Sequence, residues 1–134
     1  MFNLLIAADS LRSRTQSVCE EFGITGAQYN VLRILRGVHP GGHSRCEVAK
    51  RMLERSPDIT RLVDRLEERG LAERDRSDED RRLSITKITK SGLELIGKMN
   101  PRMSELLRYF TERVSRADCR ELSRICEGLY GEEA

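Results

Sequence analysis

Residues 56–71 read SPDITRLVDRLEERGL and carry both the start and the stop signals of an amphipathic helix. Ser56 is a favoured N-cap residue, Pro57 suits the first helical position, and Asp58 complements the positive end of the helix dipole. Gly70 is a typical helix terminator. The apolar residues recur at helical spacing on one face: Ile59, Leu62, Val63 and Leu66. The other face carries Asp58, Arg61, Asp64, Arg65 and Glu68, so a helix over 57–69 is predicted.

Three further helices are predicted upstream. Thr25 with Gln28 and Ser44 with Glu47 match the capping box, in which a hydroxyl and a side chain three residues later satisfy two free amides. The loop 39–43, HPGGH, separates the helices that these boxes begin. The apolar positions are Leu4, Ala7, Ala8, Leu11, Val18 and Phe22 in the first helix, Val31, Leu32, Ile34 and Leu35 in the second, and Val48, Ala49, Met52 and Leu53 in the third.

Downstream of Gly70 the pattern changes to two short extended segments, 71–74 and 83–88. In the second segment Leu83, Ile85 and, less regularly, Ile88 alternate with polar residues. The intervening tip, 76–82, has no apolar residue, so it must face solvent or a partner. Helical spacing returns from Thr89, with a break or kink expected near Pro101, and a last helix is predicted over 116–130.

This order of elements predicts a mainly α-helical chain with a small β-hairpin, the winged helix-turn-helix. The 134 residues fit one domain, with the winged helix over about 25–92 and flanking helices in 1–22 and 93–134. A helix over 57–69 would be about 20 Å long, enough to lie across a DNA major groove about 12 Å wide. In this motif the hairpin reaches the flanking backbone or the minor groove.

The charge balance alone does not identify a partner, because the net charge is only +2. The type of base is more informative: 20 of the 24 basic residues are arginine, whose guanidinium suits bidentate contact with phosphate and guanine. Codon bias in a GC-rich genome is the alternative explanation of this arginine excess.

No apolar run approaches the roughly 18 residues of a membrane span, and no basic flank precedes the short run at Leu4–Ala8, so we expect a cytoplasmic protein that is neither secreted nor inserted. The four cysteines lack CxxC spacing and are expected to be free thiols. No phosphate-binding glycine loop, GxSxG or HExxH motif is present, so we expect no enzyme and no cofactor.

Two sequence features resemble the MarR family of bacterial transcriptional regulators. The first is the pair of segments EVAKRM at 47–52 and SPDITRLVDRLEERGL at 56–71. The second is the wing, where Asp80 and Arg82 match the family's DxR signature and Ile88-Thr89 follows at the family's distance. The resemblance is strong over about 28–92 and weaker in the flanks.

The resemblance implies a sequence-specific DNA-binding regulator, in most members a repressor, whose homodimer reads a pseudo-palindromic site. In the wing, Arg82 resembles the family's minor-groove arginine and Asp80 the acid that orients it. The full set expected at or near double-stranded DNA is Ser44, Ser56, Pro57, Asp58, Thr60, Arg61, Arg65, Arg76, Asp80, Arg81 and Arg82. For Arg61 and Arg65 a solvated helix face with local ion pairs is the alternative, for Ser44 a plain helix cap, and for the wing a polar hairpin tip.

The family's homodimer is held by its terminal helices, and here these carry apolar faces larger than one small winged helix can cover. The expected dimer contacts are Leu4, Leu11, Phe22, Leu106, Phe110, Leu122, Ile125 and Leu129. Packing of these helices on one another within one chain is the alternative.

Family resemblance also implies a cleft for a small effector, often aromatic and anionic, that loosens DNA binding, lined by the first, second and fifth helices. Two other sensing chemistries are alternatives. His39, His43 and Cys46 suit a metal, although three ligands on a loop are insufficient, and no metal is expected; Cys19 would sense oxidants. Cys119 and Cys126 share one helix face and suit core packing. A different class of function, a winged helix that binds proteins, suits the near-neutral charge but does not need the DxR spacing.

Overall fold

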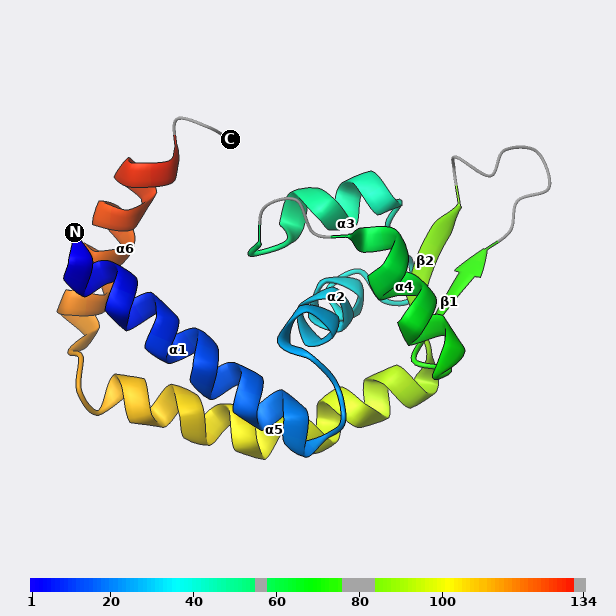
Figure 1. Cartoon of the computed structure of the whole chain (residues 1–134), viewed down its shortest axis with the longest axis horizontal. Coiled ribbons are helices and arrows are strands. Elements are labelled where there is room, and N and C mark those ends of the chain that lie inside the picture. Colours follow the sequence, from blue (N-terminus) through cyan, green and yellow to red (C-terminus); the bar gives the residue numbers. More distant parts are fainter. Residues whose placement is uncertain (55–57, 76–83, 132–134) are drawn as a thin grey trace. The chain divides into compact units, whose positions relative to one another are not determined.

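The computed structural model describes residues 1–54, 58–75 and 84–131. It contains six α-helices and one hairpin: α1 (Phe2–Glu21), α2 (Gly26–Arg36), α3 (Arg45–Arg51), α4 (Ile59–Glu68), β1 (Ala72–Asp75), β2 (Ile85–Ile88), α5 (Lys90–Thr111) and α6 (Arg116–Tyr130). The mainly helical winged helix-turn-helix predicted from the sequence is therefore confirmed, with α3 and α4 as its two central helices and the hairpin beside α4 (Figure 1). Contacts divide the chain into two compact units, Met1–Asn100 and Pro101–Ala134.

The predicted capping residues set most helix starts. Thr25 and Gln28 form a complete capping box at α2, and Ser115 accepts a hydrogen bond from the Asp118 amide at α6. Ser44 caps α3 by accepting from the Glu47 amide at 3.3 Å. The Glu47 carboxylate pairs with Lys50 and Arg51, so the Ser44 cap works without the box's return bond.

The predicted start of α4 was two residues early. Asp58 is its N-cap, and the Asp58 carboxylate accepts a hydrogen bond from the free Arg61 amide at 3.1 Å. The helix has 10 residues, about 15 Å at 1.5 Å per residue, rather than the expected 13. Its end follows the prediction: Gly70 has φ +69°, and the Leu71 amide donates to the Leu66 carbonyl at 2.9 Å.

The hairpin is antiparallel, with Ala72 opposite Ile88 and Asp75 opposite Ile85. The predicted alternation in the second strand was wrong in phase, because Thr86 and Ile88 are buried while Ile85 is half-buried. Thr86 and Ile88 share one face of β2, and α2 contacts this strand. A third segment lies at the edge of β2, where His43 exchanges two backbone hydrogen bonds with Thr86, of 3.0 and 2.9 Å.

Helix α5 is continuous through Pro101, so of the break or kink expected near that residue, the break does not occur. One expectation about α3 was wrong. Helix α3 ends at Arg51, and Leu53, expected on its apolar face, is 81% exposed.

The core of the winged helix is formed by side chains from four helices. Those of α2, α3 and α4 occupy the positions that the apolar pattern predicts, and α5 adds two more. The fully buried ones include Leu32, Leu35, Val48, Val63, Leu66, Ile96 and Met99. This packing buries one face of α4 and leaves its charged face in solvent.

Candidate nucleic-acid interface

The exposed face of α4 carries two cations, Arg61 and Arg65. Arg61 and Arg65 lie one helical turn apart, and both are exposed. The sequence allowed Arg61 to pair locally with Asp64, but Asp64 pairs with Arg74 of β1 instead. Within the described part of the chain, neither the Arg61 nor the Arg65 guanidinium has an acidic partner. Both groups are therefore available to an anion.

The neighbouring acids are engaged within the protein. Asp58 caps α4, and Arg74 contacts both Asp64 and Glu67, with 3.1 Å between the Arg74 Nε and the Glu67 Oε2. Asp75 lies 2.6 Å from the Lys87 Nζ on the neighbouring strand, and this contact raises the pKa of Lys87. These internal partners reduce the repulsion that the acids would exert on a polyanion, although Glu68 remains exposed on α4.

The first residue of α3 joins this surface, which sequence reasoning missed. The Arg45 Nη1 donates to the Thr60 hydroxyl at 3.0 Å, and Ser44 precedes it at the helix cap. Thr60 is exposed in the first turn of α4, so this contact brings the starts of both helices together. The position of Arg45 directly after a capping serine was the available signal.

Six of the expected DNA-contacting residues lie outside the described residues: Ser56, Pro57, Arg76, Asp80, Arg81 and Arg82. Their proposed roles stay predictions. The described members are Ser44, Asp58, Thr60, Arg61 and Arg65, and the structure brings these together at α3 and α4.

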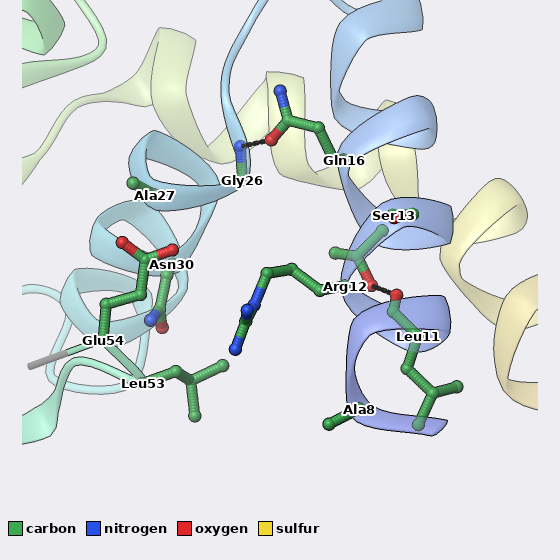
Figure 2. Close-up of a pocket in the computed structure, with 11 residues that line it drawn as sticks. Ala8, Leu11, Arg12, Ser13, Gln16, Gly26, Ala27, Asn30, Leu53 and Glu54 are labelled. Atoms are coloured by element: carbon green, nitrogen blue, oxygen red, sulfur yellow. Dashed lines mark hydrogen bonds between the residues drawn. The ribbon is translucent and has the colours of Figure 1, made fainter. Parts of the chain in front are cut away.

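A separate cavity of about 480 Å³ lies within the first unit (Figure 2). It is lined by Ala8, Leu11, Arg12, Ser13, Thr15 and Gln16 of α1, by Gly26, Ala27 and Asn30 of α2, and by Leu53 and Glu54. The first and second helices, which were expected to line an effector cleft, both line this cavity, and its third wall is the connection between α3 and α4 rather than α5. Arg12 points across the cavity towards Leu53 (Figure 2). The Gln16 Oε1 accepts from the Gly26 amide at 2.7 Å and links α1 to α2.

Comparison with known proteins identifies the family. The MarR family model matches residues 22–83. A crystal structure of a MarR transcription factor from Planctomyces limnophilus is 32% identical, covers 94% of this chain and 91% of its own, and superposes with a TM-score of 0.75. The chain belongs to the MarR family of transcriptional regulators.

Two other relatives extend the comparison. The transcriptional repressor IacR of Pseudomonas putida is 29% identical over 103 residues, which are 77% of this chain and 60% of IacR. The structure of Bordetella bronchiseptica BpsR, from work on regulation of its DNA binding by 6-hydroxynicotinic acid, is 20% identical with a TM-score of 0.83, covering 96% of both chains. The relatives are named as regulators, so the alternative of a winged helix that binds proteins is not favoured.

This MarR protein carries exposed apolar residues on α1 and on α6. Every residue from Met1 to Arg14 is exposed, including Leu4 and Leu11 of the predicted dimer contacts. Helix α6 buries none of its residues, and Leu122, Ile125 and Leu129 are exposed on it. Phe22, Leu106 and Phe110 are half-buried.

This MarR structure gives little support to the two alternative sensing chemistries, oxidation of Cys19 and binding of a metal. Burial raises the pKa of the Cys19 thiol to about 11, which opposes formation of the reactive thiolate. No three His, Cys, Asp or Glu side chains of the described residues gather where they could hold a metal, and His39, His43 and Cys46 are all described. His43 instead uses its backbone to bind Thr86.

Within the described ranges, no helix is both long and apolar enough to cross a membrane.

Proposed function

We propose that this MarR protein is a cytoplasmic repressor that binds a pseudo-palindromic operator as a homodimer, with α4 in the major groove. The observation that carries the proposal is the exposed pair Arg61 and Arg65, whose acidic neighbours are held by other partners. The activity is binding alone, without catalysis. The repressor IacR among the relatives supports the direction of regulation.

The remaining contacts are assigned by position. Thr60 and Arg61 read base edges near the start of α4, and Arg65 contacts the phosphate backbone further along. Ser44 caps α3 and Asp58 caps α4. Ser44 also offers a backbone amide to phosphate. Before α4, Ser56 and Pro57 lie near the bases. In the wing, Arg82 enters the minor groove with Asp80 orienting it, while Arg76 and Arg81 contact phosphates.

A second copy of the chain completes the terminal helices. The exposed leucines and isoleucines of α1 and α6 are a large apolar surface for a single protomer, and a two-fold partner would cover the same faces on both chains. With two copies of α4, half-sites about 10 bp apart follow, which is one turn of the double helix. The whole chain of 134 residues then acts as one regulatory domain.

The 480 Å³ cavity is the proposed effector site, a size that suits a small organic molecule. The surface of its lining is mostly apolar, with Arg12 as a cationic group and Glu54 as an acidic one. A small aromatic molecule whose anionic group pairs with Arg12 fits it. The BpsR structure, described with 6-hydroxynicotinic acid, supports control by a small molecule in a related fold.

Affinity selection from random 30-bp duplexes tests the proposal. Wild type is expected to enrich a two-fold symmetric motif, and Arg61→Ala to bind the enriched duplex about 10- to 100-fold more weakly, because a bidentate arginine–base contact is lost. Arg120→Ala removes the same charge from an exposed site on α6 and is expected to bind like wild type. Failure of the wild-type protein to enrich any motif would contradict the proposal.

A further inference from the structure

The recognition helix and the wing must meet DNA together, so something must fix α4 relative to the hairpin. The chain between them supplies only the turn at Gly70, where φ is +69°. A side-chain contact also joins β1 to α4. Arg74 on β1 contacts Asp64 and Glu67, which lie three residues apart on α4 and so face the same side of it.

The arginine of this contact is enclosed, although the Asp64 and Glu67 side chains are 49% and 36% exposed. The Arg74 side chain is 17% exposed, whereas the Lys87 side chain, in the hairpin's other ion pair, is 31% exposed. Its Nη2 donates to the Asp64 carboxylate, while its Nε lies 3.1 Å from the Glu67 Oε2 without making a hydrogen bond there. One hydrogen-bonded ion pair and one electrostatic contact thus hold the guanidinium between two carboxylates of α4. Arg74 therefore constrains the angle between β1 and α4.

The other edge of the hairpin is held to α3. Thr86, the cross-strand partner of Arg74, exchanges two backbone hydrogen bonds with His43, which precedes the Ser44 cap. Gly42 permits the approach, since a Cβ there would lie 2.2 Å from the Thr86 carbonyl oxygen. The base of the wing is thus attached to α3 through backbone and to α4 through Arg74.

We propose that Arg74 is a positioning residue for DNA recognition: it sets the angle between α4 and the wing without contacting DNA itself. This inference rests on the proposed function. Arg74 holds the base-reading face of α4 and the wing at a fixed separation, which a sequence-specific site requires and non-specific phosphate binding does not.

The test compares affinities for the selected 30-bp duplex and for a scrambled duplex at one salt concentration. Arg74→Met keeps the length of the side chain but removes the guanidinium. We expect the ratio of the affinity for the selected duplex to that for the scrambled duplex to fall at least about tenfold. Lys87→Met is the matched control, because it breaks the ion pair to Asp75 within the hairpin and is expected to keep the ratio within about threefold. An equal effect of the two variants would overturn the proposal.

A triple variant separates position from charge. Arg74→Met leaves Asp64 and Glu67 uncompensated, so repulsion alone could weaken DNA binding. Adding Asp64→Asn and Glu67→Gln removes both negative charges. If Arg74 sets the angle, the triple variant keeps the low affinity ratio; if the ratio returns to the wild-type value, Arg74 acts by charge compensation and the proposal is wrong.

Amide hydrogen exchange without DNA provides a readout that does not depend on the proposed function. We expect faster exchange across Ala72–Asp75 in Arg74→Met than in Lys87→Met. If the wild-type protein selects no duplex, the regulator proposal fails, while this comparison still decides the contact. Equal exchange in the two variants would overturn the role of Arg74 in holding the wing base.

Discussion

At the scale of single residues, Arg65 is the described side chain best placed to contact phosphate without reading sequence. Binding that neutralises phosphates releases counterions, so the logarithm of affinity falls linearly with the logarithm of salt concentration. Arg65→Ala is expected to lower this slope by about one per protomer and to weaken selected and scrambled duplexes to a similar degree. Fluorescence anisotropy titrations at four salt concentrations measure it. An unchanged slope would remove Arg65 from the interface.

The cysteines differ in reactivity because they differ in burial. Burial raises the pKa of Cys19 from 9.0 to about 11, while Cys46 is exposed on α3. At pH 8 Cys19 is almost entirely the thiol, so we expect iodoacetamide to label Cys46 at least about 100-fold faster, as followed by mass spectrometry of peptides. Comparable labelling rates would contradict the buried position.

The same shift gives Cys19 a pH signature. Because the folded-state pKa is raised, the neutral thiol's contribution to stability is present in full below about pH 9 and is lost as pH rises through about 11. Cys19→Ala is expected to reduce this loss, as seen in chemical denaturation at pH 8 and pH 10.5. A variant that loses as much stability as wild type over this range would show that another group is responsible.

At the scale of elements, the attachment of the hairpin to α3 depends on Gly42. A Cβ at this position would lie 2.2 Å from the Thr86 carbonyl oxygen and 2.6 Å from the Ile85 Cγ2. We expect Gly42→Ala to lower the free energy of unfolding by about 1–3 kcal/mol, because the backbone must separate.

Gly97→Ala is the matched control for Gly42. Its Cβ would meet nothing within 4 Å, and alanine is the better helix former in α5, so unchanged or slightly increased stability is expected. Urea denaturation measures both variants. Equal stability of Gly42→Ala and wild type would show that the close approach to Thr86 is not needed.

Local signals predicted most elements because their causes lie within a few residues. The Thr25–Gln28 box, the Ser44 cap and the Gly70 terminator each involve neighbours in sequence. The prediction failed where contacts with distant parts of the chain determine which residues are buried. Thr86 and Ile88 share the buried face of β2, which α2 contacts from elsewhere in the chain, and no periodicity within the strand reveals this contact.

Two further outcomes depended on competing local choices. At the start of α4, both Ser56 and Asp58 are good caps, and sequence alone does not rank them. In α5, Pro101 removes one hydrogen bond, yet the helix continues, with Ile96 and Met99 buried just before it.

The residues of the candidate site were likewise predicted where the cause is local and missed where it is a distant contact. Arg61 and Arg65 were predicted because helical period places them on the polar face of α4. Arg45 and Arg74 were missed because their partners, Thr60 and the Asp64–Glu67 pair, come from other elements. Long-range pairing of this kind becomes visible only in the fold.

At the scale of the whole molecule, the proposed dimer links the two ends of the chain to the spacing of the DNA site. The uncovered faces of α1 and α6 need a partner, and a two-fold partner supplies a second α4. The binding site must then have the same symmetry as the protein. A monomer that binds DNA with one winged helix would instead read a single half-site.

Hydroxyl-radical footprinting of the selected duplex is the most direct measurement of dimeric, sequence-specific recognition. We predict two protected clusters related by two-fold symmetry, with centres about 10 bp apart, and loss of both in Arg61→Ala at the same protein concentration. A single asymmetric cluster would contradict the dimer, and uniform protection along the duplex, unchanged by Arg61→Ala, would contradict sequence-specific recognition by α4.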